Sequence, residues 1–476
     1  MTAIGLDDLM RLVTQRRPGL IEGLPPSAPA ITSITQDSRT VEQGSLFCAI
    51  RGASDGHEYV SAAVERGAAA VLVDHLTGAE VPEVVVSDTR EATGYVASAF
   101  WGNPSESLRL VGVTGTNGKT SIVSMIEHLV SFCGDASASM GTLTGSLTTS
   151  AAPEFQEALA RHRDDGCAVV AAEVSSHALD QKRIAGSRVS VAVFSNLSQD
   201  HLDYHQDMDD YFAAKARLFD PELSESAVVD VSDEWGRRLA RHTTIETIEV
   251  DGGAIAAAAQ LGQRTSTFVW RERTITLPLG GRFSVHNALL AAETCLLLGY
   301  DPMTIAKGLE STPPIPGRFE SIDAGQPFAV VVDYSHTPAS IEAAVSSARA
   351  LTSGRVLLVF GAAGDRDPGK RPLMGQAARH ADLLYVTSDN PRTEDPDMII
   401  DQVVAGTVDA VGEVVRIADR REAIRSAISD AQDGDIVVIA GKGHEDYQIV
   451  GTTRRDFDDR LEARRALADR GWGSAA

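Results

Sequence analysis

The segment VGVTGTNGKTS, residues 111–121, has the residue types of a phosphate-binding loop. It follows a run of β-branched residues and precedes the helical pattern SIVSMIEHLVSF. In such a loop the backbone N–H groups at Gly115 and Gly118 approach phosphate oxygens, Lys119 reaches the terminal phosphates, and the hydroxyl of the next threonine can bind Mg²⁺. The strict pattern has glycine where Val113 stands, so we interpret the segment as a variant nucleotide-binding loop.

A second group of reactive side chains follows two other apolar runs. Glu173 lies at the end of AVVAAEV, and the segment SNLSQDHLDYH supplies Asp200, His201, Asp203 and His205. Taken alone, Glu173 is equally well explained as a solvated residue at a strand end. The acidic and histidine side chains of the second segment are too dense for simple packing, and oxygen atoms are the ligands that Mg²⁺ prefers. We therefore expect one of them to contact a metal ion.

The chain also supplies the elements that would position these groups. Several β-branched runs end in polar or glycine-rich residues and are separated by helical patterns, which indicates parallel sheets covered on both faces. Ligands of such sheets bind beyond the carboxyl ends of the strands, where the motifs stand. The predicted fold class is therefore α/β with mostly parallel sheets. The runs are residues 110–113, 168–174, 189–194, 329–332, 356–360, 383–386 and 436–439.

Chain length and two segments rich in Gly, Pro and Ser predict several domains. At 476 residues the chain is too long for one ordinary core, given roughly 100–200 residues per domain. Gly, Pro and Ser gather in WGNPSES at 101–107 and Pro recurs in STPPIPGRF at 311–319, so we place boundaries there. The first hundred residues alternate short apolar runs with helical stretches, for example at 44–50, 60–70 and 84–86. The predicted domains are residues 1–106, 107–314 and 315–476.

Composition narrows the class of protein. A formal net charge of -23 disfavours binding to a nucleic acid polymer or to an anionic membrane surface. The four cysteines form no C-x-x-C pair, which fits a reducing compartment, and we find neither a signal-peptide pattern nor an apolar run long enough to span a membrane. We therefore expect a cytoplasmic enzyme that acts on small molecules.

Several motifs together resemble those of the Mur ligases, which build the peptide stem of peptidoglycan. The resemblance extends over the whole chain and includes GTNGKT, EVSSH, NLSQDHLDYH, YFAAKARLF, HNALLAAE, PGRFE, DYSHTP, GAAGDRDPGKR, SDNPR and GKGHEDYQ. It implies a small N-terminal α/β domain for the UDP-linked precursor, a central P-loop ATPase domain and a C-terminal Rossmann-like domain for the incoming amino acid. It also implies an ATP-dependent ligase that activates a carboxylate as an acyl phosphate, which the amine of the next residue then attacks.

The resemblance also implies roles for individual residues. Lys119, Glu173, His201 and Lys215 match catalytic positions. ATP would be bound by Gly115, Thr116, Asn117, Gly118, Lys119, Thr120, Ser121, Asn287, Arg318 and Asp333. The UDP-linked precursor would be bound by Ser38, Gly52, Ala53, Ser54, Thr148, Thr149, Ser175, Gln181 and Arg183, although Leu147 stands where relatives often have asparagine. For the precursor segments near the N-terminus, turn chemistry alone is an equally good explanation. Asn287 as a helix cap and Arg318 as a structural ion pair stay open as alternatives.

Lys215 is the position at which pattern and resemblance disagree. Within DYFAAKARLF it lies in a helical apolar pattern, where a lysine usually extends its charged end to the surface. In similar ligases the matching lysine is carbamylated by CO₂ to N6-carboxylysine, and the new anion serves the metal site. The resemblance thus implies Mg²⁺ bound by Thr120, Glu173, His201 and Lys215.

The amino acid added is expected to be meso-diaminopimelate, joined to UDP-N-acetylmuramoyl-L-alanyl-D-glutamate. That amino acid carries a second carboxylate at the end of its side chain, which the planar guanidinium of Arg392 can bind in a bidentate way. The implied pocket comprises Arg366, Asp389, Asn390, Pro391, Arg392, Gly441 and Glu445. By pattern alone, DNPR is a capped turn before a helix.

Three alternatives stay open. The same reaction could add L-lysine or another diamino acid, or the chain could be a folylpolyglutamate synthetase-like ligase, which would lack the SDNPR and GKGHEDYQ pair. A P-loop ATPase with a mechanical or regulatory role belongs to a different class and would form no covalent product. We expect a monomer whose partners are small-molecule substrates.

Overall fold

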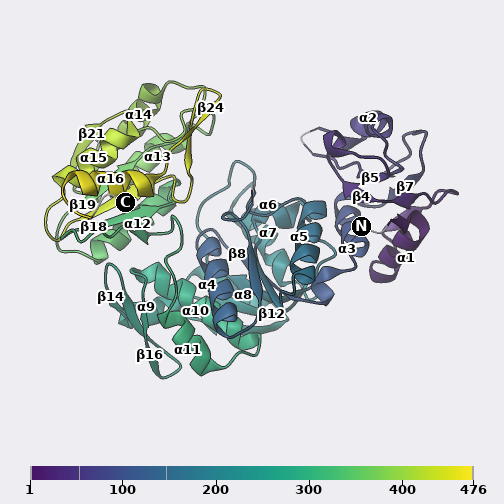
Figure 1. Cartoon of the computed structure of the whole chain (residues 1–476), viewed down its shortest axis with the longest axis horizontal. Helices are drawn as coiled ribbons and strands as arrows, with labels where there is room; N and C mark the ends of the chain where they lie inside the picture. Colours follow the sequence, from purple (N-terminus) through teal and green to yellow (C-terminus); the bar gives the residue numbers. More distant parts are fainter. Residues whose placement is uncertain (1–2, 53, 146, 474–476) are drawn as a thin grey trace.

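The computed structural model describes residues 3–52, 54–145 and 147–473. Three sheet-centred parts follow one another along the chain, and Figure 1 shows the N-terminal and C-terminal parts on opposite sides of the central part. None of the helices in the described ranges combines the length and the apolar character needed to cross a membrane.

The N-terminal part contains a five-stranded sheet in the order β2-β7-β6-β5-β4, parallel except at β2. The expected segment 60–70 divides into a short helix and a strand, because Gly67 at φ +108° ends the helical backbone before Ala70. The elements are β1 Ile4–Gly5, α1 Leu6–Arg16, β2 Ile21–Gly23, β3 Ala30–Ile31, β4 Ser33–Thr35, β5 Ser45–Cys48, α2 Val60–Glu65, β6 Ala70–Val73, β7 Glu83–Val86 and α3 Thr89–Phe100.

The central part is a six-stranded, wholly parallel sheet in the order β13-β12-β11-β8-β10-β9. Side chains alternate along β8, so that Val111 and Val113 enter one core and Leu110 enters the core on the opposite face. The strands are β8 Arg109–Thr114, β9 Ser137–Met140, β10 Val169–Glu173, β11 Val189–Phe194, β12 Ser224–Asp230 and β13 Glu246–Val250, with a separate antiparallel sheet of β14 Gln260–Leu261, β15 Ser266–Trp270 and β16 Arg273–Leu277. The helices are α4 Lys119–Phe132, α5 Ala152–Asp164, α6 Ser176–Asp180, α7 Met208–Ala216, α8 Glu234–His242, α9 Gly252–Ala258, α10 Arg282–Leu297 and α11 Pro302–Glu310.

The C-terminal part repeats this layered design with the strand order β17-β18-β22-β19-β20-β21. Only the edge strand β17 is antiparallel, and two cores again lie on the two faces. The strands are β17 Glu320–Ser321, β18 Ala329–Asp333, β19 Val356–Phe360, β20 Leu383–Val386, β21 Glu413–Arg416 and β22 Ile436–Ala440, followed by the hairpin β23 Tyr447–Val450 and β24 Thr453–Asp456. The helices are α12 Pro338–Ala350, α13 Lys370–Ala377, α14 Pro396–Val404, α15 Arg420–Asp430 and α16 Asp459–Asp469.

The seven β-branched runs predicted from the sequence all form parallel strands of the two large sheets, so the fold class is confirmed. The exact domain boundaries stay predictions. The 3-10 turn Pro104–Glu106 and the irregular segment before β17 lie where those boundaries were placed.

Candidate active site

The nucleotide-binding loop lies at the carboxyl end of β8 and leads directly into α4. Gly115 and Gly118 adopt φ values of +147° and +89°, which favour glycine. A Cβ atom on Gly115 would lie 1.9 Å from Ser195 Oγ, and one on Gly118 would lie 2.6 Å from Asn287 Oδ1. The two glycines therefore serve close packing as well as the turn.

Two lysines converge on one carbonyl oxygen of this loop. Lys119 Nζ donates to Gly115 O at 2.9 Å and to Thr116 O at 2.9 Å, and Lys215 Nζ donates to the same Gly115 O at 2.9 Å. Lys215 is buried beside Tyr211, 1% exposed, so its interpretation as a surface lysine is wrong. The apolar residues around Lys215 instead bury its whole side chain in the central part.

Burial changes the protonation of both lysines. It lowers the pKa of the Lys119 ammonium, and burial together with the nearby charge of Lys119 lowers the pKa of Lys215 far below its usual value. A neutral Lys215 amine is a nucleophile at ordinary pH, whereas an ammonium is not.

Glu173 and Thr120 line a common small hollow with Gly141. The Glu173 carboxylate accepts hydrogen bonds from the backbone N–H of Thr142 at 2.8 Å and from its hydroxyl at 3.3 Å. A Cβ on Gly141 would lie 2.3 Å from Glu173 Oε1. The backbone at Gly141 is therefore so close to this carboxylate that a residue with a side chain would clash with it. A hydroxyl and a carboxylate facing one hollow are the ligand types that fit Mg²⁺.

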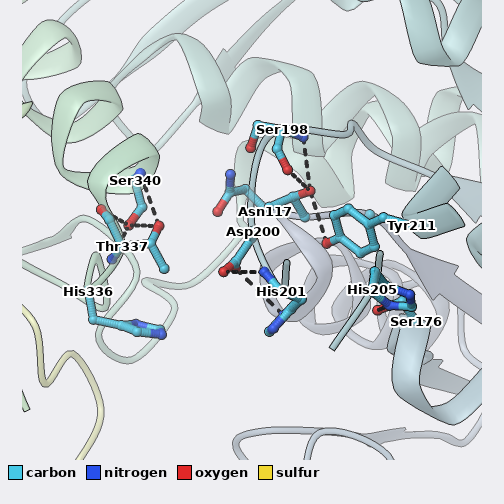
Figure 2. A network of polar contacts seen from close by, with 12 residues as sticks. Asn117, Ser176, Ser198, Asp200, His201, His205, Tyr211, His336, Thr337 and Ser340 are labelled. Atoms are coloured by element: carbon cyan, nitrogen blue, oxygen red, sulfur yellow. Dashed lines mark hydrogen bonds and ion pairs between the residues drawn. The ribbon is translucent and has the colours of Figure 1, made fainter. Parts of the chain in front are cut away.

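The segment between Asp200 and His205 does not act as one cluster. Figure 2 shows Asp200 beside His201, whose Nε2 lies 3.6 Å from the carboxylate, and burial lowers the pKa of His201 to about 4. His205 is instead buried, with Nε2 3.0 Å from Ser176 Oγ and its ring stacked on Tyr211. The expectation that these residues are too dense for packing is therefore wrong for His205.

Residues assigned to ATP surround the loop. Asn117 N donates to Asn196 Oδ1 at 3.0 Å, and Arg318 Nη2 donates to Thr120 Oγ1 at 2.8 Å across the central and C-terminal parts. Asp333 accepts a hydrogen bond at 2.8 Å from the backbone N–H of Phe319, the residue that follows Arg318. Thr116 and Ser121 lie in the loop and in the first turn of α4. Arg318 is thus held beside the phosphate-binding loop by its own neighbours.

The precursor residues fall into two groups. Ser38 and the segment containing Gly52 and Ser54 follow the parallel strands β4 and β5, so they share one edge of the N-terminal sheet. Ala53 lies outside the described residues.

The second group is joined by hydrogen bonds in the central part. Arg183 Nη1 donates to Thr149 O at 2.7 Å and its Nη2 donates to Gln181 Oε1 at 2.9 Å, while Ser175 N donates to Thr149 Oγ1 at 3.1 Å. Thr148 immediately precedes Thr149, and its hydroxyl lies 3.4 Å from that of Thr142. Leu147, where relatives often have asparagine, is 54% exposed.

The residues assigned to the amino acid meet at the carboxyl ends of β20 and β22. Asn390 Nδ2 donates to Glu445 Oε2 at 3.1 Å, and a Cβ on Gly441 would lie 3.7 Å from Asp389 Oδ2. Arg392 follows Pro391, and its backbone N–H donates to Ile449 O, while its Nε is buried and has no hydrogen-bond partner among the described residues. Arg366 is exposed on the loop after β19.

Comparisons with known proteins agree with this geometry. Three family models match the chain: Mur ligase family, catalytic domain, at residues 30–101, Mur ligase middle domain at 113–295, and Mur ligase, glutamate ligase domain, at 317–443. The chain is 43% identical to the UDP-N-acetylmuramoyl-L-alanyl-D-glutamate--2,6-diaminopimelate ligase of Geobacillus kaustophilus (strain HTA426), over 93% of this chain and 96% of that protein. The chain belongs to the Mur ligase family.

Three further matches show which Mur ligases this chain is similar to. The ligase of the same name from Nostoc sp. (strain PCC 7120 / SAG 25.82 / UTEX 2576) is 43% identical over 94% of this chain and 97% of its own. A solved structure of a ligase with that name is 32% identical, with a TM-score of 0.68 over 99% of this chain and 100% of its own. A MurF structure from Acinetobacter baumannii, 19% identical with a TM-score of 0.64 over 98% of this chain and 99% of its own, supports the fold alone.

Sequence reasoning missed two residues of this Mur ligase site. Thr142 covers the Glu173 carboxylate, but its position in an irregular segment after β9 carries no motif. Lys442 is fully buried between the carboxylates of Asp389 and Glu445, and its place inside GKGHE was the available signal. Elsewhere in the described ranges, His57, Asp74 and His75 bring possible metal ligands within 4.8 Å of one another, but the guanidinium of Arg51 already pairs with Asp74.

Proposed function

We propose that this chain adds meso-diaminopimelate to UDP-N-acetylmuramoyl-L-alanyl-D-glutamate, with conversion of ATP to ADP and phosphate. The observation that carries the proposal is the pairing of two sites in one chain. A phosphate-binding loop with two converging lysines lies in the central part. A group of carboxylates, with an arginine Nε that has no partner among the described residues, lies in the C-terminal part. The names of relatives at 43% identity support the same activity.

In the proposed reaction a carboxylate oxygen of the precursor attacks the γ-phosphorus of ATP, and the bond to the ADP oxygen breaks. The amine of the incoming amino acid then attacks the carbonyl carbon of the acyl phosphate, loses a proton and expels phosphate. Lys119 is proposed to supply positive charge to the transferring phosphoryl group, since its ammonium lies on the phosphate-binding loop against Gly115 O and Thr116 O. Arg318, beside Thr120, is assigned to the nucleotide.

Mg²⁺ fits the hollow between Thr120 and Glu173, with His201 as a further proposed ligand. When bound it would neutralise charge on the phosphates during transfer. We propose that the neutral Lys215 amine attacks CO₂ and loses a proton to form N6-carboxylysine. The approach of Lys119 and Lys215 to one carbonyl supports this step, because an anion at position 215 would attract the nearby ammonium of Lys119.

The remaining assignments follow the same logic. Ser38, Gly52, Ala53 and Ser54 are proposed to bind the uridine end of the precursor, and the group around Arg183 to bind its pyrophosphate, sugar and peptide. The domains are proposed to be residues 1–106, 107–314 and 315–476. We further propose a cytosolic monomer, and the four free cysteines support the reducing location.

The experiment that tests the proposal supplies purified protein with ATP, Mg²⁺ and UDP-N-acetylmuramoyl-L-alanyl-D-glutamate. Meso-diaminopimelate and L-lysine are offered in separate reactions, and the product mass identifies the residue added. We expect the diaminopimelate product to form at the higher efficiency. Preference for L-lysine would overturn the choice of amino acid, and ATP hydrolysis without any new covalent product would overturn the ligase itself.

A further inference from the structure

A buried lysine stands behind the proposed amino-acid pocket. The Lys442 side chain is 0% exposed, and its Nζ donates to Glu445 Oε2 at 3.1 Å, Asn390 Oδ1 at 3.2 Å and Asp389 Oδ1 at 3.4 Å. A buried ammonium is costly unless such acceptors surround it. The lysine therefore joins the segment after β20 to the segment after β22.

Lys442 also fixes which atoms of its partners remain available. Both polar atoms of the Asn390 side chain have partners, because its Oδ1 also accepts from Ile449 N at 2.9 Å and its Nδ2 donates to Glu445. Asp389 uses only Oδ1 for the lysine, and its Oδ2 lies 3.7 Å from where a Cβ of Gly441 would be. Free carboxylate oxygens are thus kept next to the glycine assigned to the amino acid.

A second buried cation nearby is already neutralised. Arg420 and Asp459 are both 0% exposed and form a bidentate pair, with Nε to Oδ1 at 2.7 Å and Nη2 to Oδ2 at 2.6 Å. With Arg366 exposed on the loop after β19, the buried and half-buried charges left at these two segments are Lys442 and Arg392 against Asp389 and Glu445. These four groups are balanced, with two positive and two negative charges.

This balance distinguishes the two candidate amino acids. The side chain of meso-diaminopimelate ends in an ammonium and a carboxylate, which together carry no net charge, whereas that of L-lysine ends in an ammonium alone. A balanced pocket accepts the first without residual charge and leaves the second with an uncompensated positive charge. Removing one cation from the walls would make the pocket net negative and reverse that advantage.

We infer that Lys442 is a specificity-determining positioning residue, which neutralises one of the two pocket carboxylates and so favours a zwitterionic side-chain end over a purely cationic one. The inference rests on the proposed function. Lys442 is too deeply buried to touch the amino acid, so it acts through Asp389 and Glu445, whereas Arg392 is the cation assigned to the substrate carboxylate.

The test replaces Lys442 with glutamine, which keeps a hydrogen-bond donor and removes the charge. We expect the ratio of kcat/KM for meso-diaminopimelate to that for L-lysine to fall by about tenfold or more, mainly through KM for diaminopimelate. KM for ATP should not change. The matched control is Lys307→Gln, which alters an exposed lysine in the last turn of α11 and should leave the ratio unchanged.

A structural role would give a different result. If Lys442→Gln lowers both efficiencies equally, or leaves the ratio at the wild-type value, the inference is overturned. If the single variant fails to fold, Glu445→Gln is compared with the double variant Lys442→Gln/Glu445→Gln, in which loss of the lysine charge should again lower the ratio about tenfold, and an equal ratio overturns the inference. A wild-type enzyme that joins neither amino acid would overturn the proposed function and the inference together.

Discussion

The two sites of this chain bury lysines in opposite ways. In the central part, Lys119 and Lys215 both donate to Gly115 O, and within the described residues neither has a carboxylate within 4.0 Å. In the C-terminal part, Lys442 lies between two carboxylates at 3.1 and 3.4 Å. The two central lysines thus have no carboxylate in contact in the part of the chain that the structure describes, whereas Lys442 is neutralised by its own neighbours.

The difference indicates what each site lacks before substrates arrive. In the described ranges, the two central lysines lack an anion in contact with them, which the phosphates of ATP and a carbamate on Lys215 would supply. The C-terminal pocket has balanced walls and needs only a ligand that preserves the balance. Charge removal should therefore abolish chemistry in the first site and change selectivity in the second.

The largest expected effect is in the central site. Lys119→Ala should abolish ligation while the fold persists, because it removes a charge directed at the phosphoryl group and no core side chain. Product formation is followed by mass spectrometry, and circular dichroism checks the fold. Lys307→Ala, an exposed lysine on α11, is the matched control. Near-normal turnover of Lys119→Ala would remove the nucleotide-binding loop from the mechanism.

The second effect concerns the proposed carbamate. Lys215→Ala should be nearly inactive, and acetate or formate should restore part of its activity, because a small carboxylate can replace the carbamate oxygens in the space left by the side chain. The rate of product formation is measured over a series of carboxylate concentrations, with chloride at equal ionic strength as the control. An active Lys215→Ala enzyme that ignores bicarbonate would refute the carbamate.

The third effect lies in the C-terminal pocket. Arg392→Ala should lower kcat/KM for meso-diaminopimelate by roughly ten- to a hundred-fold or more, since losing a charge-assisted pair costs about 1.5–3 kcal/mol. KM for ATP should change little, because the nucleotide is bound in the central part. Unchanged diaminopimelate kinetics would show that another cation binds the distal carboxylate.

Much of the fold could be predicted from the sequence, because the strands carry the signal in their own residues. Runs such as 189–194 and 356–360 are exactly the observed strands β11 and β19, since fully buried parallel strands need continuous apolar side chains. Residues 60–70, expected as one segment, divide into a helix and the start of a strand, because Gly67 with positive φ ends the helix, which a hydrophobic pattern does not reveal.

The site was predictable where motifs are contiguous and less so where side chains meet through the fold. Local pattern placed Lys215 at the surface, although the tertiary structure buries it 2.9 Å from the carbonyl of Gly115, a hundred residues away in sequence. His205 was expected to serve chemistry because of its neighbours in sequence, yet its neighbours in space are Ser176 and Tyr211. Contacts of this kind depend on the packing of separate elements, which spacing along the chain does not encode.

The smallest expected effect concerns an ion pair that holds the loops of the C-terminal pocket together. Glu394 accepts from Arg371 Nη1 at 2.8 Å and Nη2 at 2.7 Å, and from the backbone N–H of Asp365 at 2.6 Å. These hydrogen bonds, those from Arg371 first, lower the pKa of the Glu394 carboxyl from 4.5 to about 2. The glutamate thereby ties the loop containing Arg366 to the segment containing Arg392.

Because this pKa is lower in the folded chain than in the unfolded chain, the unfolded chain takes up a proton first as the pH falls. The pair therefore stabilises the fold fully above about pH 4.5, and its contribution is lost as the pH falls from there toward about 2. Glu394→Gln should be slightly less stable at pH 7 and should lose less stability than the wild type on acidification from pH 5 to 3.5. Urea midpoints at the two pH values measure the difference, with Glu246→Gln, exposed at the start of β13, as the control. The effect should be small because the carboxylate is partly solvated, and an equal acid-dependent loss in Glu394→Gln and wild type would mean that the pair adds nothing to the stability of the pocket loops.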